Sequence, residues 1–266
     1  MAGFSMRAGL HGLLLVLLLM PGLAAATLLN EIRAQGRLRV AIAGALPPYN
    51  HYTPDGTAQG SDADIARAMA RDLGVRLEVV RVVNSDRVAA LLARRADVVI
   101  SALSISPERE RLIAFSVPYA TIDTVIAAPP PLQLSSPLDL RGRRVGVLAG
   151  SANAEHLLQN APGVKLLSYA EHDRLVEAYL AGEFEILSVT RNVVDEVNAR
   201  RPPRPLVEHF RQMEFEVAVG MPRGEKALRD WINAWIVVRL RDHTLAGIHL
   251  RHHGRRLLAL PGAAGR

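Results

Sequence analysis

The first regular pattern in the chain is a strand followed by a helix. Positions 37–43 (RLRVAIA) alternate between polar and apolar residues and are rich in Val and Ile, which predicts a β-strand. The segment SDAD, which begins at Ser61, predicts a helix with this serine as N-cap and Asp64 completing a capping box. Apolar residues then recur every four positions up to Leu73, and Gly74 ends the helix.

The pattern continues with a strand, a helix and a strand, at 76–82, 86–95 and 97–101. In this second helix the apolar spacing places Val88, Leu91 and Leu92 towards the core. Strand–helix–strand–helix–strand is the order of a mostly parallel sheet with helices on its faces.

A second unit of the same kind follows a proline-rich break at 129–137 (PPPLQLSSP). Strands at 144–148, 164–169 and 184–189 alternate with helices at 151–159, 172–181 and 191–199. A last strand at 215–220 leads to helices at 226–242 and 244–253, the first with Trp231 and Trp235 in its apolar stripe. Two similar units in one chain predict two lobes.

The N-terminal segment has the features of a secretory signal peptide. One positive charge precedes the apolar run GLLLVLLLM, and Ala24-Ala25-Ala26 provides a small-residue cleavage site. We therefore expect residues 1–26 to be removed and the mature chain to begin at Thr27. The chain contains no cysteine, so it has neither a disulfide nor a lipid-modified cysteine, and we expect an exported protein that is not lipid-anchored.

Composition and charge narrow the functional classes. The net charge of +6 comes from dispersed arginines, and aromatic residues make up only 5% of the chain, which argues against a nucleic-acid partner. His249, His252 and His253 lie in a basic helix without carboxylates, so a metal site is not expected there. The sequence also lacks a nucleophile elbow and an H-E-x-x-H motif.

The most informative stretch is ISALSISPERERLIAFSVPY, at 100–119. It leaves an apolar strand through Ser101, Ala102 and Ser104, whose hydroxyl and backbone N–H groups can face a cleft. Ser106 before proline is a typical helix cap, and Arg109 follows one turn later. A guanidinium beside N–H donors suits a carboxylate ligand, although a surface ion pair with a nearby glutamate is an equal alternative for the arginine.

Two further strand ends could reach the same edge of a sheet. The segment GVLAGSA runs from Gly146 through glycine into a helix, which favours an anion, although an ordinary turn explains it as well. The third strand end is SVT, which finishes at Thr190.

At this point the chain resembles the family 3 periplasmic solute-binding proteins, the polar amino-acid receptors of ABC importers. The matching segments are GRLRVAIAGALPPYN, GSDADIARAMARDLGV, ALLARRADVVISALSISPERERLIAFSVPY, DLRGRRVGVLAGSANAEHL, LAGEFEI, FEVAVGMPRG and RDHTLAGIHL. They cover nearly all of the mature chain.

The resemblance implies a periplasmic-binding-protein-like α/β fold of two lobes with mostly parallel sheets, joined by two crossing strands near 121–126 and 214–217. We expect lobe one at 27–124 and 216–253, lobe two at 125–215, and a flexible tail at 254–266. The lobes are expected to close on a ligand held between them.

The resemblance also implies ligand-binding roles. Arg109 would grip the ligand's α-carboxylate, Ser104 would offer a hydroxyl, and Ala102 a backbone N–H. Ser151 and Ala152 would offer further N–H groups from lobe two.

The sequence departs from the family pattern where the ligand's ammonium group would bind. The usual aspartate aligns with Thr190, an acceptor without charge. An uncompensated ammonium in a closed cleft costs a few kcal/mol, roughly. We therefore expect a ligand that has a carboxylate and lacks an α-ammonium group, unless Glu183, Glu185 or water substitutes for the aspartate.

Two aromatic positions of the family align with Leu46 and Asn84, while Tyr49 keeps its aromatic type as either a ligand contact or a packing residue.

The function expected from these features is capture of a small carboxylate for the permease of an inner-membrane ABC importer, by a periplasmic monomer without cofactor, metal or enzymatic activity. One alternative is a periplasmic accessory or sensory protein with the same fold. Another is an enzyme similar to the cyclohexadienyl dehydratases, but the segment from Thr190 to Val193 offers no catalytic carboxylate.

Overall fold

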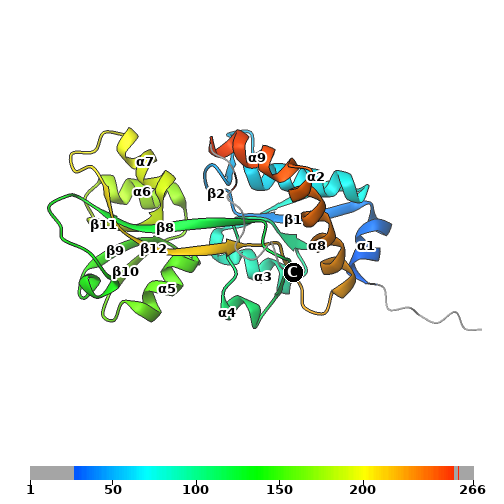
Figure 1. Cartoon of the computed structure of the whole chain (residues 1–266), viewed down its shortest axis with the longest axis horizontal. Helices are drawn as coiled ribbons and strands as arrows, with labels where there is room; N and C mark the ends of the chain where they lie inside the picture. The colour runs from blue at the N-terminus through cyan, green and yellow to red at the C-terminus, as the bar shows by residue number, and fades with distance from the viewer. Residues whose placement is uncertain (1–26, 255–256, 258–266) are drawn as a thin grey trace, which may run out of the picture.

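The chain forms two α/β lobes that lie side by side. The computed structural model describes residues 27–254 and residue 257. Figure 1 shows the lobes joined by two long neighbouring strands, β8 (Ala120–Ala128) and β12 (Val207–Val217). The predicted two-lobed fold with two crossing strands is thereby confirmed. The predicted signal peptide lies outside the described residues, as does most of the predicted tail.

Lobe one is built on a five-stranded mixed sheet. Its strands in spatial order are β5 (Arg76–Arg81), β1 (Arg37–Ile42), β6 (Val98–Val99), β13 (Gly220–Met221) and β7 (Ala114–Phe115). The strands β5, β1 and β6 are parallel, whereas β13 is antiparallel to both of its neighbours. A small antiparallel sheet contains β2 (Ala45–Leu46), β3 (Asn50–Tyr52) and β4 (Ala58–Gln59).

Lobe two has the same design. Its strands in spatial order are β10 (Lys165–Tyr169), β9 (Arg144–Leu148), β11 (Ile186–Thr190), β8 and β12. The first three are parallel, and β8 is antiparallel to both β11 and β12. Because β8 and β12 pair from Ala120 opposite Val217 to Ala128 opposite Val207, the link between the lobes is a continuous two-stranded ribbon.

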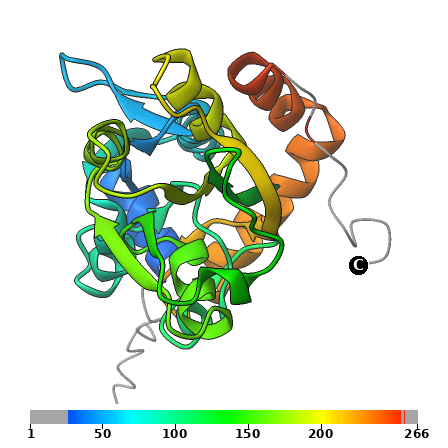
Figure 2. The ribbon, with the colours of Figure 1, turned by 90° about the vertical axis from the view of Figure 1, so that its left-hand side faces the viewer.

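Helices flank both sheets. Those of lobe one are α1 (Leu28–Gln35), α2 (Ser61–Leu73), α3 (Arg87–Leu92), α4 (Pro107–Glu110), α8 (Lys226–Arg241), α9 (Thr244–His253) and the 3-10 helix η1 (Asn84–Asp86). Those of lobe two are α5 (Ala152–Asn160), α6 (His172–Leu180), α7 (Arg191–Ala199) and the 3-10 helix η2 (Pro137–Leu140). Figure 2, in which lobe two faces the viewer, shows α8 and α9 gathered on one side of the molecule.

Buried apolar residues form a core in each lobe and a third cluster that spans both. The third cluster runs from Leu91 in lobe one to Leu175 in lobe two, and both side chains are almost fully buried. The lobes are therefore in direct contact, as in the closed state of a hinged protein. Burial of Trp235 agrees with the expected core role of the tryptophans.

The start of α2 differs by one residue from its prediction. Gly60, with φ of 107°, is the N-cap, and no side chain caps the helix. A Cβ on Gly60 would lie 2.4 Å from the carbonyl oxygen of Tyr49, so only glycine fits here. The predicted cap, Ser61, instead hydrogen-bonds through Oγ to Nε2 of His253 at 3.1 Å.

The buried face of α3 also differs from its prediction. Leu91 faces the core as expected, but Leu92 is 57% exposed. Arg87 takes the inward position instead and is 4% exposed. Since Arg87 and Leu91 are four residues apart, they share one face of the helix.

The ends of the chain hold two elements that the periodicity did not predict correctly. Helix α1 was not predicted, although Thr27 caps it by accepting a hydrogen bond from the N–H of Asn30 at 3.4 Å. The last strand was placed at 215–220, whereas β12 begins at Val207 and ends at Val217.

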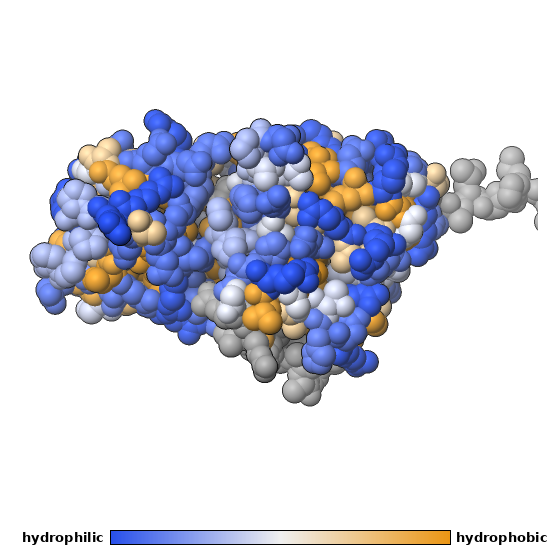
Figure 3. Space-filling view, turned by 90° about the horizontal axis from the view of Figure 1, so that it is seen from above, coloured by the Kyte–Doolittle hydropathy of each residue, from blue (hydrophilic) through white to orange (hydrophobic). Residues whose placement is uncertain are grey.

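The surface of both lobes is mainly polar on the face seen from above. Figure 3 shows a mostly hydrophilic face with smaller apolar patches on both lobes. None of the helices within residues 27–254 is both long and apolar enough to span a bilayer.

Candidate ligand-binding site

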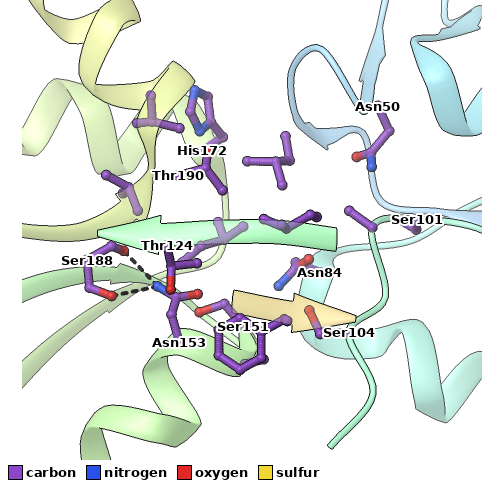
Figure 4. Close-up of a pocket in the computed structure, with 18 of the residues that line it drawn as sticks. Asn50, Asn84, Ser101, Ser104, Thr124, Ser151, Asn153, His172, Ser188 and Thr190 are labelled. Carbon is purple, nitrogen blue, oxygen red and sulfur yellow. Dashed lines mark hydrogen bonds between the residues drawn. The ribbon is translucent and has the colours of Figure 1, made fainter. Parts of the chain in front are cut away.

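A cavity of about 60 Å³ lies between the lobes. Lobe one lines it with polar residues that follow its strands: Asn50, Asn84, Arg87, Ser101 and Ser104. Lobe two contributes Ser151, Asn153, His172, Ser188 and Thr190, and the crossing strands contribute Ile122, Thr124 and Phe215. Figure 4 shows the labelled polar side chains of both lobes on the two sides of the crossing strands. Since one water needs roughly 10–15 Å³ of such volume, the cavity has room for about four to six waters. A small organic acid would fill a similar space.

The structure brings most of the predicted site residues to this cavity. Ala102, Ser104, Ser151, Ala152 and Thr190 all line it. They lie at the ends of β6, β9 and β11, as the strand-end rule for parallel sheets predicts.

The backbone around Ala102 is tightly held. Its φ of 46° is left-handed, and its backbone hydrogen-bonds to the carboxylate of Asp62. The Oγ of Ser101 accepts the N–H of Ala43 at 2.9 Å. In this structure the backbone N–H that the resemblance assigned to the ligand is therefore engaged within lobe one.

The lobe-two wall is ordered by an amide–hydroxyl network. Nδ2 of Asn153 donates to the carbonyl oxygen of Ser188 at 2.7 Å and to its Oγ at 2.8 Å. Ser188 in turn donates to Oε1 of Gln212 at 2.6 Å, and Gln212 donates to the carbonyl oxygen of Asn153 at 2.9 Å. This closed network fixes the first turn of α5 against β11 and β12.

Thr190 is the exception on this wall. It is 6% exposed, yet its Oγ1 has no hydrogen-bond partner among the residues that the structure describes. Thr124, its partner across β11 and β8, donates instead to the carbonyl oxygen of Met213 at 3.2 Å. A buried hydroxyl without a partner is costly, so Thr190 is free to bond a ligand.

Arg109 does not line the cavity. Ser106 caps its helix as predicted, and the Arg109 guanidinium is buried between the lobes. It donates to the carbonyl oxygens of Ser104 at 2.8 Å and Gly150 at 3.0 Å, and forms an ion pair with Glu155 at 3.1 Å. The arginine thus lies between the predicted segments, with a carboxylate of lobe two as its partner.

Tyr49 lies elsewhere, beside a second and smaller cavity near α9. Its ring packs edge-on against His253, with ring centres 4.4 Å apart. Leu46 and Asn84 do line the interlobe cavity, with an aliphatic and an amide side chain where the resemblance expected aromatic walls.

Asp62 is a buried carboxyl group of lobe one. Burial raises its pKa to about 6, against hydrogen bonds from Nδ2 of Asn50 at 2.6 Å and the hydroxyl of Tyr119 at 3.2 Å. It lines the smaller cavity.

Among the described residues, no aspartate or glutamate lines the interlobe cavity. The two glutamates that could have replaced the missing aspartate are occupied elsewhere. Glu183 accepts the hydroxyl of Tyr169 at 2.8 Å, and Glu185 pairs with Arg204. An ammonium group in the cavity would find no counter-charge on its walls.

Sequence reasoning missed Arg87 as a cavity residue. Arg87 lies three and four residues before the buried Ala90 and Leu91 and shares their face of the helix, but an apolar count gives no weight to an arginine there. It also missed His172, which lines the cavity while its Nε2 contacts Oε2 of Glu196 at 2.7 Å. That hydrogen bond is the main reason that the pKa of Glu196 is lowered.

The C-terminal histidines pair with neighbouring side chains. The rings of His249 and His253 are stacked 4.1 Å apart, and His252 contacts Asp64 at 2.8 Å. The described part of the chain contains no group of three potential metal ligands.

Comparison with known proteins agrees with the fold. The profile of the bacterial extracellular solute-binding proteins, family 3, matches residues 38–255. The chain belongs to this family.

Relatives within the family include binding proteins and an enzyme. The L-cystine-binding protein TcyJ of Escherichia coli is 27% identical over 229 residues, which cover 85% of this chain and 86% of TcyJ. The cyclohexadienyl dehydratase of Pseudomonas aeruginosa is 27% identical over 214 residues, or 78% and 79% of the two chains. A crystal structure of a mutant of ArgBP from T. maritima superimposes with a TM-score of 0.78 at 22% identity, covering 86% of this chain and 100% of that one.

Proposed function

We propose that this protein is a periplasmic solute-binding protein that captures a small carboxylate between its lobes and delivers it to an ABC importer. The observation that carries the proposal is the interlobe cavity, whose hydrogen-bonding groups come from both lobes and include the unpartnered hydroxyl of Thr190. Membership of a solute-binding family and relatives that bind amino acids support it.

Ligand capture in this fold is a population shift. The lobes contact one another through Nδ2 of Asn84 and the carbonyl oxygen of Ala149 at 2.7 Å, and through Gln159 and Glu108 at 2.9 Å. A ligand that bonds to both walls gains those bonds only when the lobes are closed. It therefore stabilises the closed state by its differential affinity for that state.

Arg109 is the proposed partner of the ligand's carboxylate, because it lies directly behind the cavity wall, where it donates to the carbonyl oxygen of the lining residue Ser104. Its guanidinium already binds a carboxylate, Glu155, across the lobe boundary. A ligand carboxylate would share the guanidinium or replace Glu155 on it, because both are acceptors for the same planar donors.

The test is calorimetric titration with a panel of small carboxylic acids. Arg109→Gln should weaken the tightest binder by roughly 10- to 100-fold, the value of a charge-assisted hydrogen bond. Arg111→Gln removes the same charge from an exposed neighbour and should leave the affinity unchanged. Equal affinities in the two variants would show that Arg109 does not bind the ligand. If no acid of the panel binds to the wild type, the proposed function is wrong.

Delivery needs a separate experiment. Uptake of the radiolabelled ligand should fall in cells that lack the gene and return when the wild-type protein is supplied. Binding without any effect on uptake would favour an accessory or sensory role.

A second candidate is a dehydratase-type enzyme, favoured by the cyclohexadienyl dehydratase relative and by the buried His172, which lines the cavity and contacts the partly exposed Glu196. Elimination of water needs a general acid at the reacting group. Incubation with prephenate tests this candidate, because only an enzyme converts it to product at a rate above the uncatalysed one.

A further inference from the structure

Arg87 is a cation in the cavity wall, and within residues 27–254 no carboxylate is paired with it. Its side chain lines the cavity, and the residue is 4% exposed. Nε donates to the carbonyl oxygen of Asn84 at 2.8 Å, and Nη1 donates to that of Ser101 at 2.7 Å. A weaker bond reaches the carbonyl oxygen of Ala102 at 3.4 Å, and Nη2 donates to that of Gly150 at 3.0 Å. Every one of these acceptors is a neutral peptide group.

Arg109 provides a direct comparison within the same region. Both arginines donate through Nη2 to the carbonyl oxygen of Gly150, each at 3.0 Å. Arg109 also has the carboxylate of Glu155 at 3.1 Å, whereas no carboxylate of the described residues forms an ion pair with Arg87. Two guanidinium groups thus meet at one carbonyl, and only one of them is paired.

The charge of Arg87 is incompletely balanced by its surroundings. Burial, and after it the nearby positive charge of Arg109, lower its pKa to about 9. Asp62 and Glu155 act in the opposite direction but do not offset these effects. Burying the charge of Arg87 without a paired carboxylate costs free energy of folding. An anion bound in the cavity would pair with the guanidinium and offset that cost.

A second, independent feature of the same cavity points to a ligand. Thr190, on the lobe-two wall, has a buried Oγ1 without a partner. A hydroxyl can donate to a carboxylate or carbonyl oxygen. The walls thus offer one unpaired cation and one unpaired hydroxyl, and no carboxylate of the described chain lines them.

We propose that Arg87 binds an acidic group of the ligand inside the cavity, and that the preferred ligand is a small organic acid without an ammonium group. The inference rests on the proposed function and names the chemical class of its ligand. Arg87 is then a specificity-determining residue, because its charge attracts an acid while the same charge repels an amine.

The test uses pairs of compounds that differ mainly in an α-amino group. Wild-type protein is titrated by calorimetry with pyruvate and L-alanine, with succinate and L-aspartate, and with 2-oxoglutarate and L-glutamate. At least one acid should bind ten-fold or more tightly than its amino partner. If compounds bind but none of the three acids binds more tightly than its amino partner, the inference is wrong.

The variant Arg87→Met carries the second half of the test. It should weaken the preferred acid at least 20-fold, whereas Arg76→Met, which removes the same charge from an exposed position of β5, should change its affinity less than three-fold. Arg87→Lys retains the charge but lacks the planar donors, so its affinity for the acid should lie between those of the wild type and Arg87→Met. If thermal unfolding shows that Arg87→Met does not fold, the affinity of Arg87→Lys is compared with that of the wild type instead.

The failures of the two proposals are distinguishable. If no compound of the panel binds to the wild type, the proposed function and this inference fall together. If an acid binds and the Arg87 variants bind it as tightly as the wild type, the proposed function stands and the inference alone is wrong.

Discussion

Replacing Gly150 with alanine should prevent the lobes from closing. Gly150 has φ of 67°, and a Cβ built on it lies 2.6 Å from Cα of Ser85 in the opposite lobe. Ordinary carbon contacts begin at about 3.5 Å, so the two backbones must move apart by about 1 Å. The neighbouring atom is backbone, which cannot rotate out of the way as a side chain could.

That displacement would break the hydrogen bonds that end on this segment. The carbonyl oxygen of Gly150 accepts from Arg87 and Arg109 at 3.0 Å each, and that of Ala149 accepts from Asn84 at 2.7 Å. An additional 1 Å, roughly, takes all three beyond hydrogen-bonding distance. At about 1 kcal/mol each, the closed state loses about 3 kcal/mol, which corresponds to about 100-fold in ligand affinity.

Gly142 provides a matched control. Its φ is 72°, and a Cβ on it would have no heavy atom within 4 Å. Alanine at either position should lower the free energy of unfolding by about 1–2 kcal/mol, because both must hold a left-handed backbone. Only Gly150→Ala should also weaken binding of the preferred acid in calorimetry and abolish the ligand-induced decrease in radius of gyration in X-ray scattering. If the two variants bind the acid equally well, the reasoning about lobe contact is wrong.

Three further predictions concern single side chains. Thr190→Asp should bind α-amino acids at least ten-fold more tightly than Thr190→Asn, because only the charged side chain compensates an ammonium group; equal affinities in calorimetry would contradict this. Burial raises the pKa of Asp62 to about 6 from 3.8, so its stabilising contribution is present below pH 4 and lost as the pH rises through 6. Asp62→Asn should therefore gain about 3 kcal/mol relative to the wild type between pH 4 and pH 7 in urea unfolding, and a pH-independent difference would refute this. Trp235→Phe should lower the free energy of unfolding by about 2 kcal/mol without changing ligand affinity, since it removes the bond from Nε1 to Asp72 at 2.8 Å together with part of a buried ring; an unchanged free energy of unfolding would contradict this.

Local periodicity predicted the bounds of several elements correctly. Strand β9 and helices α7 and α9 have the bounds that their patterns indicated. Strand β12 shows the limit, because the segment EHFRQMEF does not alternate and pairs along its length with β8. A strand that is specified by its partner leaves little periodic signal in its own residues.

The candidate site was predictable to the level of segments. Strand ends place Ser104, Ser151 and Thr190 at one cavity, because parallel strands finish at the same edge of each sheet. The direction of a long side chain was not predictable in this way. Arg109 turns to Glu155, forty-six positions away in the sequence, and only the meeting of the two lobes brings that carboxylate to it.

The reason that Arg87 was missed as a cavity residue is itself informative. Helix α3 has only six residues and follows the 3-10 turn η1, so fewer than two turns define which face is inward. An apolar count favours Val88 and Leu92, and it cannot favour a buried arginine. A sequence that places a charge on an inward face, against the cost of burying it, violates the rule that the core is apolar. Such violations concentrate at functional sites, because a ligand supplies the compensation that the folded chain lacks. In α3, the helix-face prediction thus fails at Arg87, the residue that gives the cavity wall its charge.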